Sequence, residues 1–258
     1  MRRIGLFDSG LGGLITARWV WMRRPKVDLL YYGDTAHLPY GDKSPAQLRG
    51  YVREIVRFLI AAGAEGIGIA CNTASAVAVD VAQEVAAGLP VWDAIQPTLA
   101  YFRAHRLPEP VGVIGTYTTI RSHLYGRALS QMGYTVKELA TPLLVPLIEE
   151  GWTKHPATRA ALRTYLTELG EVRTLVLACT HYPLLVPLIR RYYLRRGQDV
   201  KIISTARLLA EAICSPLTDS GQKGSLTLWL SDPNPRFIAL ASRFWGSPLR
   251  PMPLPCPS

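Results

Sequence analysis

The sequence predicts an α/β fold in which mostly parallel strands are covered by helices on both faces. Short, continuously apolar runs recur along the chain, and longer segments with helical periodicity separate them. Of the 258 residues, 48% are hydrophobic and 19% are charged, which is typical of a globular protein and excludes disorder over most of the length. Strands that are apolar along their whole length are buried on both faces, as in parallel sheets flanked by helices.

The elements expected from this pattern alternate along almost the whole chain. The expected strands are Ile4–Phe7, Asp28–Tyr32, Gly66–Ala70, Pro90–Ala94, Val111–Gly115, Thr135–Leu139, Thr174–Ala178, Val200–Ile203 and Ser225–Leu230. The expected helices are Pro45–Ala62, Ser75–Ala87, Pro97–His105, Thr119–Met132, Thr158–Leu169, Pro183–Arg196 and a segment that begins at Leu208 and carries Cys214. Residues 247–258 contain five prolines, so we expect a flexible tail, and we assign no role to Cys256 within it.

A weak internal repeat divides the chain into two halves. Residues Ile4–Ser9 resemble Val111–Thr116 at an offset of 107, and Ile69–Thr73 resemble Leu177–His181 at an offset of 108. In each matched pair a strand runs into a residue with a hydroxyl or thiol group. The two nearly equal offsets predict two similar halves.

Cys71 and Cys179 occupy matched places in this repeat, each at the carboxyl end of an expected strand and just before a helix. Ligands of parallel α/β sheets bind at that edge. Helix N-termini favour anions, so we expect a lowered pKa for both thiols. The alternative, that each cysteine is a small buried hydrophobic residue, stays open here, and it is our interpretation of Cys214.

Two opposed thiols can invert a carbon centre. One thiolate removes a proton from a carbon acid, and a protonated thiol on the opposite face returns one. Racemisation of an amino acid has an equilibrium constant of one, so two near-equivalent acid–base groups suit it. The two matched cysteines therefore indicate racemisation.

Several other classes of site lack their sequence signatures. The four cysteines form no C-x-x-C pair, and cysteines and histidines show no metal-ligand spacing, so we expect no metal. The cluster Gly10–Gly13 is not a dinucleotide fingerprint, because Ile15 occupies its last glycine position. No apolar stretch is long enough to span a membrane and no signal peptide is found, so we expect a cytoplasmic protein with reduced thiols.

The net charge of +10 comes mainly from arginines scattered in pairs such as Arg190-Arg191 and Arg195-Arg196. A charge of this sign can indicate an anionic partner or nucleic acid. No long basic run or aromatic-interleaved motif occurs, so we interpret these arginines as solvated helix faces.

Four blocks of sequence carry a resemblance to a known family. They are Ile4–Leu14, Tyr32–Gly41, Ala70–Ala76 and Cys179–Leu185, with weaker matches at Ile114–Thr116, Thr119–Ile120 and Val145–Glu149. At these residues the sequence resembles the glutamate racemases of the cofactor-independent aspartate/glutamate racemase superfamily. It departs from the family pattern at His37, Gln96, Thr141 and Ser204, which bears on oligomer contacts and regulation rather than on the reaction.

The resemblance implies two similar three-layer α/β domains with the active site in the cleft between them. Residues 1–95 and 208–258 would form the first domain and residues 96–207 the second. It also implies a cofactor-independent isomerase that interconverts L-glutamate and D-glutamate, supplies D-glutamate for peptidoglycan in the cell wall, and forms a homodimer.

The resemblance also implies a set of site residues. Cys71 would act on D-glutamate and Cys179 on L-glutamate, with Asp8 and His181 as polar helpers and Glu149 as a further acidic residue of the site. The positions that match substrate contacts are Asp8, Ser9, Tyr40, Gly41, Asn72, Thr73, Thr116, Thr119, Thr180 and His181.

Two alternatives to this function stay open at this point. The same two-thiol chemistry could act on aspartate or another amino acid, since the sequence does not give the pocket volume. Alternatively, the chain could be a regulatory protein that binds nucleic acid or DNA gyrase. The net positive charge suggests this alternative, whereas the intact pair Cys71 and Cys179 argues against a loss of enzymatic activity.

Overall fold

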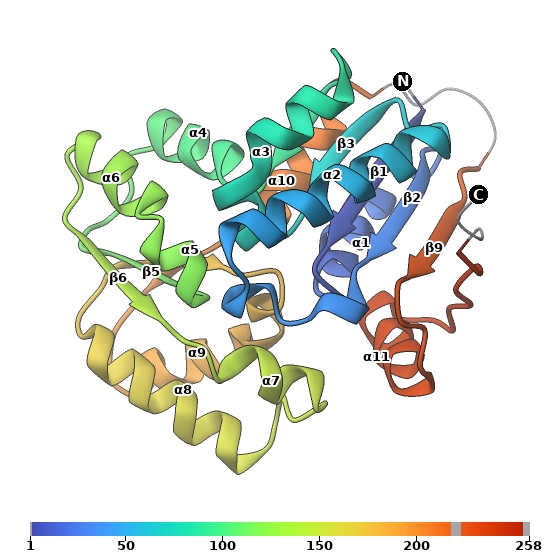
Figure 1. Cartoon of the computed structure of the whole chain (residues 1–258). Coiled ribbons are helices and arrows are strands. Elements are labelled where there is room, and N and C mark those ends of the chain that lie inside the picture. The colour runs from blue at the N-terminus through green and yellow to red at the C-terminus, as the bar shows by residue number, and fades with distance from the viewer. Residues whose placement is uncertain (1, 218–222, 255–258) are drawn as a thin grey trace.

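The computed structural model describes residues 2–217 and 223–254, and its strands form two parallel sheets (Figure 1). The first sheet has the order β4-β3-β1-β2-β9, with β1 (Arg3–Asp8), β2 (Asp28–Gly33), β3 (Gly66–Ile69), β4 (Val91–Asp93) and β9 (Leu226–Leu230). The second has the order β6-β5-β7-β8, with β5 (Val111–Gly115), β6 (Val136–Ala140), β7 (Thr174–Ala178) and β8 (Lys201–Ser204). The predicted α/β class with mostly parallel strands is therefore confirmed.

Helices cover both faces of each sheet. They are α1 (Gly13–Arg23), α2 (Pro45–Ala61), α3 (Asn72–Ala86), α4 (Gln96–Ala104), α5 (Tyr117–Arg121), α6 (Leu124–Gln131), α7 (Leu144–Glu149), α8 (Pro156–Leu169), α9 (Val186–Leu194), α10 (Thr205–Cys214) and α11 (Pro235–Trp245). Short 3-10 turns are η1 (Thr35–His37), η2 (Tyr40–Asp42) and η3 (Tyr182–Leu185). Helices α2 and α3 pack on one face of the first sheet and α1 and α10 on the other.

The alternation of side chains along β7 explains why the second sheet is covered on both sides. Val176 and Ala178 join the apolar cluster formed with α4 and α6, whereas Leu175 and Leu177 join the cluster formed with α8 and α9. Successive side chains of a strand point to opposite faces, so a continuously apolar strand needs a helix layer on each face.

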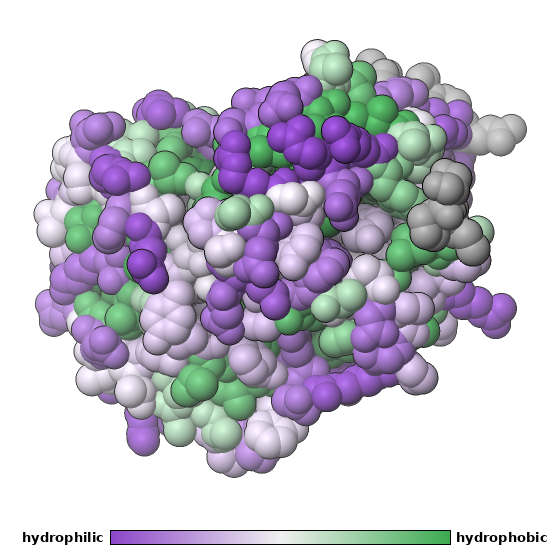
Figure 2. All heavy atoms as spheres, in the orientation of Figure 1, coloured by the Kyte–Doolittle hydropathy of each residue, from purple (hydrophilic) through white to green (hydrophobic). Residues whose placement is uncertain are grey.

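The solvent side of α2 and α3 is hydrophilic, as the purple side chains above these helices show in Figure 2. Arg49 pairs with Asp80 at 2.7 Å and Arg53 with Glu84 at 2.9 Å, joining the two helices. Such exposed pairs add little to stability individually. Of the helices in the described part of the chain, none is long and apolar enough to span a membrane.

The expected strands agree with the structure to within one residue at each end, whereas several helices differ. Helices α1, α7 and α11 were not expected. The expected helix Thr119–Met132 is two helices, because His123 adopts a positive φ of 53° between them. The first turn of the expected helix Pro183–Arg196 is the 3-10 turn η3.

Part of the proline-rich segment differs from the expected flexible tail. The backbone N–H of Met252 donates to the carbonyl of Leu228 at 2.7 Å, and Met252 forms a bridge with Trp229 beside β9. Leu249 donates its backbone N–H to the hydroxyl of Ser242 on α11. Leu249 and Met252 lie between the prolines and keep their backbone N–H groups, so they can hold the segment against α11 and the edge of the first sheet. Cys256 lies outside the described residues.

Candidate active site

A pocket lies where the carboxyl ends of strands from both sheets face each other. Its volume is about 640 Å³ with its opening included. Its polar lining consists of Ser9, Tyr40, Gly41, Asp42, Cys71, Asn72, Thr73, Thr116, Tyr117, Cys179, Thr180 and His181. Cys71 and Cys179, which follow β3 and β7, therefore share one pocket, although they belong to different sheets.

Cys71 is held by the first sheet and the helix that follows it. The buried strand β3 delivers the residue, which is 5% exposed and occupies the N-cap position of α3. Burial, and to a smaller extent the negative charge of Asp8, raise the pKa of the Cys71 thiol to about 12. The N–H of Ala74 and the hydroxyl of Ser9 oppose this rise only in part. The expected lowering of the Cys71 pKa is therefore wrong, since loss of hydration outweighs the helix N-terminus.

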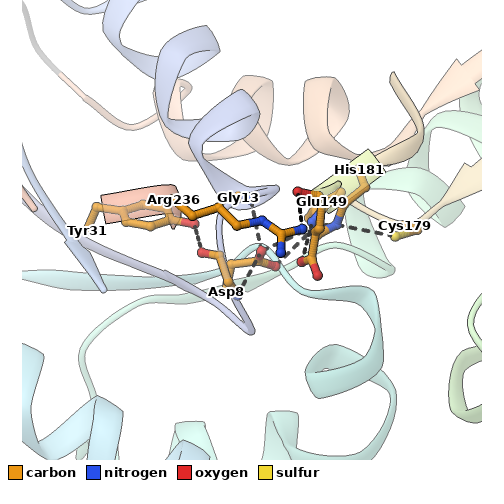
Figure 3. Close-up of polar contacts among 9 residues, drawn as sticks. Asp8, Gly13, Tyr31, Glu149, Cys179, His181 and Arg236 are labelled. Carbon is orange, nitrogen blue, oxygen red and sulfur yellow. Dashed lines mark hydrogen bonds and ion pairs between the residues drawn. The ribbon is translucent and has the colours of Figure 1, made fainter. Parts of the chain in front are cut away.

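Cys179 has an imidazole as its neighbour (Figure 3). Its Sγ lies 3.8 Å from Nδ1 of His181, which is 2% exposed. Nε2 of His181 lies 3.1 Å from Oε1 of Glu149 on α7, close enough for an ion pair but outside the alignment of a hydrogen bond. Burial opposes protonation of His181, but the contacts with Cys179 and Glu149 outweigh it and raise the His181 pKa well above its usual range. An imidazolium beside a thiol stabilises the thiolate.

Asp8 ends β1 and is completely buried. Its Oδ2 accepts the backbone N–H groups of Gly13 at 3.0 Å and Gly10 at 3.3 Å, and its Oδ1 accepts the Thr180 hydroxyl at 3.3 Å. Burial raises the pKa of Asp8, while the charge of His181 and these hydrogen bonds lower it in part. Because Thr180 follows β7 of the second sheet and lines the pocket, this contact joins the two sheets beside the pocket.

The glycine-rich loop before α1 allows this close approach. A Cβ at Gly12 would lie 2.6 Å from Nδ1 of His181 and closer still to the Thr180 hydroxyl. At Gly13 a Cβ would lie 2.6 Å from Cβ of Asp8. The cluster Gly10–Gly13 therefore brings backbone N–H groups against a carboxylate, and a side chain at Gly12 would displace Thr180 and His181 beside Cys179.

Three threonine hydroxyls meet at one wall of the pocket, where Thr73 and Thr116 line it and Thr119 lies behind them. Oγ1 of Thr73 lies 2.9 Å from that of Thr116 and 3.3 Å from that of Thr119, and the last two are 3.0 Å apart. Thr73 begins α3 beside the first thiol, and Thr116 caps α5 after β5. The trio offers exchangeable donors and acceptors to a carboxylate.

The structure distinguishes lining residues from supporting ones among the predicted site residues. Thr119, Asp8 and Glu149 do not line the pocket but contact residues that do. The hydroxyl of Tyr40 donates to the buried Asp34 at 2.6 Å, so Tyr40 presents its ring and backbone rather than its hydroxyl.

The sequence prediction missed the residues that hold Asn72. Tyr125 donates its hydroxyl to Oδ1 of Asn72 at 2.8 Å, and the amide of Asn72 donates to Thr205 at 3.1 Å. Asp34 was missed as well, although it follows β2 and the rule of strand ends could have found it. The same rule could have found Thr205, which directly follows β8, whereas Tyr125 lies within α6 and carries no such signal.

Across the described residues, no group of three or more histidine, cysteine, aspartate or glutamate side chains could hold a metal ion. What the pocket does hold is two buried thiols at facing strand ends, an imidazole and nearby carboxylates. This fold and this set of groups define an α/β enzyme with paired sheets and acid–base residues. The family model described as Asp/Glu/Hydantoin racemase matches residues 24–213, and the chain belongs to that family.

Curated relatives agree with this membership. A glutamate racemase from Koribacter versatilis is 44% identical over 83% of this chain and 74% of its own length. One from Geobacter metallireducens is 40% identical over 96% of this chain and 94% of its own. Among solved structures, glutamate racemase from Francisella tularensis in complex with D-glutamate has a TM-score of 0.88 and 30% identity, covering 96% of this chain and 95% of its own.

Proposed function

We propose that this chain is a glutamate racemase that interconverts L-glutamate and D-glutamate and supplies the D-enantiomer for peptidoglycan synthesis. The observation that carries the proposal is the presence of Cys71 and Cys179 in one pocket, each at a strand end of a different sheet. The names of the curated relatives and the D-glutamate in the Francisella tularensis complex support glutamate as the substrate.

In the reaction from D-glutamate, the Cys71 thiolate removes the proton from Cα and the Cys179 thiol donates its proton to the opposite face. In the reaction from L-glutamate, the roles are exchanged. After either turnover one thiol has gained a proton and the other has lost one, so the enzyme returns to its starting state by exchange with solvent. No redox step or covalent bond to the substrate is needed.

The neighbours of each thiol suit these steps. Cys71 is a neutral thiol in the free protein at ordinary pH, because its pKa is raised to about 12. We propose that Asp8, whose own pKa is raised by burial, accepts the Cys71 proton or holds the substrate ammonium. His181, protonated through Cys179 and Glu149, would stabilise the Cys179 thiolate.

The remaining polar groups suit the rest of the substrate. The hydroxyls of Thr73, Thr116 and Thr180 and the amide of Asn72 line the pocket and would bind the two carboxylates. Ser9, Tyr40 and Gly41 complete the first-sheet wall, and Thr119 would act through Thr73 and Thr116.

We also propose domain boundaries, an assembly and a location. Residues 1–95 with 208–258 and residues 96–207 would be the two domains, since each set of strands belongs to one sheet. The proposal of a homodimer rests on the resemblance to the glutamate racemases, and sedimentation would test it. The need for free thiols at Cys71 and Cys179 supports the reducing cytoplasm.

Racemisation in D₂O tests the reaction. Both enantiomers should acquire deuterium at Cα as the optical rotation decays, without an added cofactor. Complete racemisation with unlabelled product would contradict deprotonation by a thiol. D-Aspartate in a parallel assay tests the substrate, and turnover equal to that of D-glutamate would contradict the assignment of glutamate.

A further inference from the structure

A second, strongly basic groove lies between α8 and α9, on the outer face of the second sheet. Helix α8 runs along the lower edge of the molecule in Figure 1, and α9 is labelled just above it. Five arginines line the groove, namely Arg159, Arg163, Arg191, Arg195 and Arg196, over a floor that includes Leu162, Leu188 and Tyr192. Its volume is about 980 Å³ with its open side included, and it shares no lining residue with the active-site pocket.

These arginines have no acidic partner. Among residues 2–217 and 223–254, no ion pair involves any of the five. The one carboxylate of α8 is Glu168, which does not line the groove, and α9 has none. Arg196 stacks over the Tyr192 ring at 3.8 Å from its centroid, so that ring is already covered by a cation. The groove therefore presents unneutralised positive charge.

Folding does not require this arrangement. The inner side of α8 packs through Leu162 and Leu166, while Arg159 and Arg163 are exposed. Arg159 and Arg163 are four residues apart on one helix, and Arg191 and Arg195 repeat the spacing on the other wall. Like charges at this spacing destabilise a helix. A bound anion would remove that repulsion.

The spacing indicates a ligand with repeated negative charge. Four residues of helix advance about 6 Å, so each wall presents cations at about 6 Å intervals along the groove. Guanidinium groups bind phosphate oxygens in a bidentate manner. A phosphodiester strand presents phosphates in such a series, whereas a single phosphate would engage only one end. With Tyr192 covered by Arg196, no ring remains to read bases.

We propose that the groove between α8 and α9 binds a single strand of nucleic acid through its phosphodiester backbone, without base specificity. The proposal is independent of the racemase function, because the groove and the active site share no residue. It revises the interpretation of these arginines as merely solvated helix faces.

The test is fluorescence anisotropy of a labelled oligothymidylate of about 20 nucleotides with the whole chain, from about 50 to 200 mM salt. For single strands the logarithm of affinity falls with the logarithm of salt by about 0.7 per neutralised phosphate, so five arginines give a slope of about −3.5. The double variant Arg163→Gln, Arg195→Gln should lower the size of that slope by about 1.4 and weaken binding at every salt concentration.

A matched control separates the groove from net charge. Arg57 on α2 and Arg103 on α4 are exposed and line none of the grooves, and Arg57→Gln, Arg103→Gln removes the same charge. This control should keep the wild-type slope, and both double variants should keep full racemase activity. Equal weakening by the two double variants would overturn the proposal, as would no saturable binding at low salt. Binding of phosphatidylglycerol vesicles or polyglutamate in preference to the oligonucleotide would overturn it as well.

Discussion

The two halves of the active site repeat a position but not a chemistry. Cys71 and Cys179 both follow a central strand of a parallel sheet, and each strand pairs with a neighbour in equivalent register, Phe7 opposite Ile69 and Ile114 opposite Leu177. The offset that relates Cys71 to Cys179 places Thr73 opposite His181, and the offset of the neighbouring strands places Asp8 opposite Gly115. Cys71 thus has Asp8 as a titratable neighbour and Cys179 has His181, and neither neighbour has a titratable counterpart in the other half.

The difference gives the two thiols unlike electrostatic surroundings. Burial and a carboxylate hold Cys71 as a neutral thiol, whereas a protonated imidazole faces Cys179. In the proposed mechanism one thiol donates a proton while the other accepts one, so each half must do this with a different neighbour. Because the equilibrium constant is one, kcat/KM must nevertheless be equal in both directions, and any defect in either half must lower both equally.

The largest effect should come from removing either thiol. Cys71→Ala and Cys179→Ala should each lower racemisation by at least about 10³-fold, since one proton transfer loses its group. The remaining thiol should still exchange Cα–H in D₂O without inversion, for L-glutamate in Cys71→Ala and for D-glutamate in Cys179→Ala, as proton NMR would measure. Full turnover by either variant would show that the two-thiol assignment is wrong.

The reactivity of Cys71 with an alkylating agent should follow its raised pKa. At pH 8 a thiol with a pKa of about 12 is about 10³-fold less ionised than one near 8.5, and the thiolate is the reactive form. Mass spectrometry of the Cys71 peptide should show a rate that rises about tenfold per pH unit between about pH 7 and 10.

The variant Asp8→Asn gives a second test of the raised Cys71 pKa by the same alkylation assay. It removes a negative charge that raises the Cys71 pKa, so labelling should become faster at each pH. A plateau below pH 9 in the unmodified chain would contradict the raised pKa of the thiol.

Much of this site could be predicted from the sequence because strand ends are easily recognised. Continuous apolar runs located β1, β3, β5 and β7, and the edge rule then predicted Cys71 and Cys179 as site residues, whereas Asp8 and Thr116 came from the resemblance to the glutamate racemases. Helices were harder to predict. The segment Gly13–Arg23 has apolar residues around most of its circumference, including three β-branched or aromatic types, so its periodicity is weak.

The electrostatics of the site could not be predicted in the same way. The pKa of Cys71 depends on burial and on Asp8, which lies 63 residues away in the sequence, and these terms oppose the helix N-terminus. The basic groove was missed for a similar reason. Arg159 and Arg195 lie far apart in the sequence, and only the packing of α8 beside α9 brings them into one groove.

A smaller effect should follow from removing the charge of Glu149, which contacts His181. Glu149→Gln removes one of the groups that raise the His181 pKa, so the loss of activity at high pH should begin at a lower pH. The sign follows because the proposed mechanism uses the His181 imidazolium, which is lost as the pH rises through its pKa. We expect kcat/KM to fall about tenfold, equally for both enantiomers.

The matched control for this variant is Glu150→Gln. Glu150 neighbours Glu149 but is half exposed, and its carboxylate pairs with Arg236 on α11. Arg236 also donates to the backbone carbonyl of Glu149, which neither substitution removes. Its pH profile should equal that of the unmodified chain. If Glu149→Gln also leaves the profile unchanged, the contact between Glu149 and His181 does not set the protonation of the imidazole.

The smallest effect should come from the hydrogen bond between Tyr125 on α6 and Asn72 on α3. Tyr125→Phe removes the hydroxyl that donates to Oδ1 of Asn72 at 2.8 Å, next to Cys71. Loss of one buried hydrogen bond should cost about 1 kcal/mol of stability, and the freed amide should lower kcat/KM about threefold.

Tyr134→Phe is the control, because that buried hydroxyl donates to the carbonyl of His105 at 3.2 Å, far along the chain from the site residues. Thermal unfolding should shift similarly in both variants, whereas only Tyr125→Phe should affect turnover. Equal turnover in the two variants would mean that the Tyr125 hydroxyl does not position Asn72 for the reaction.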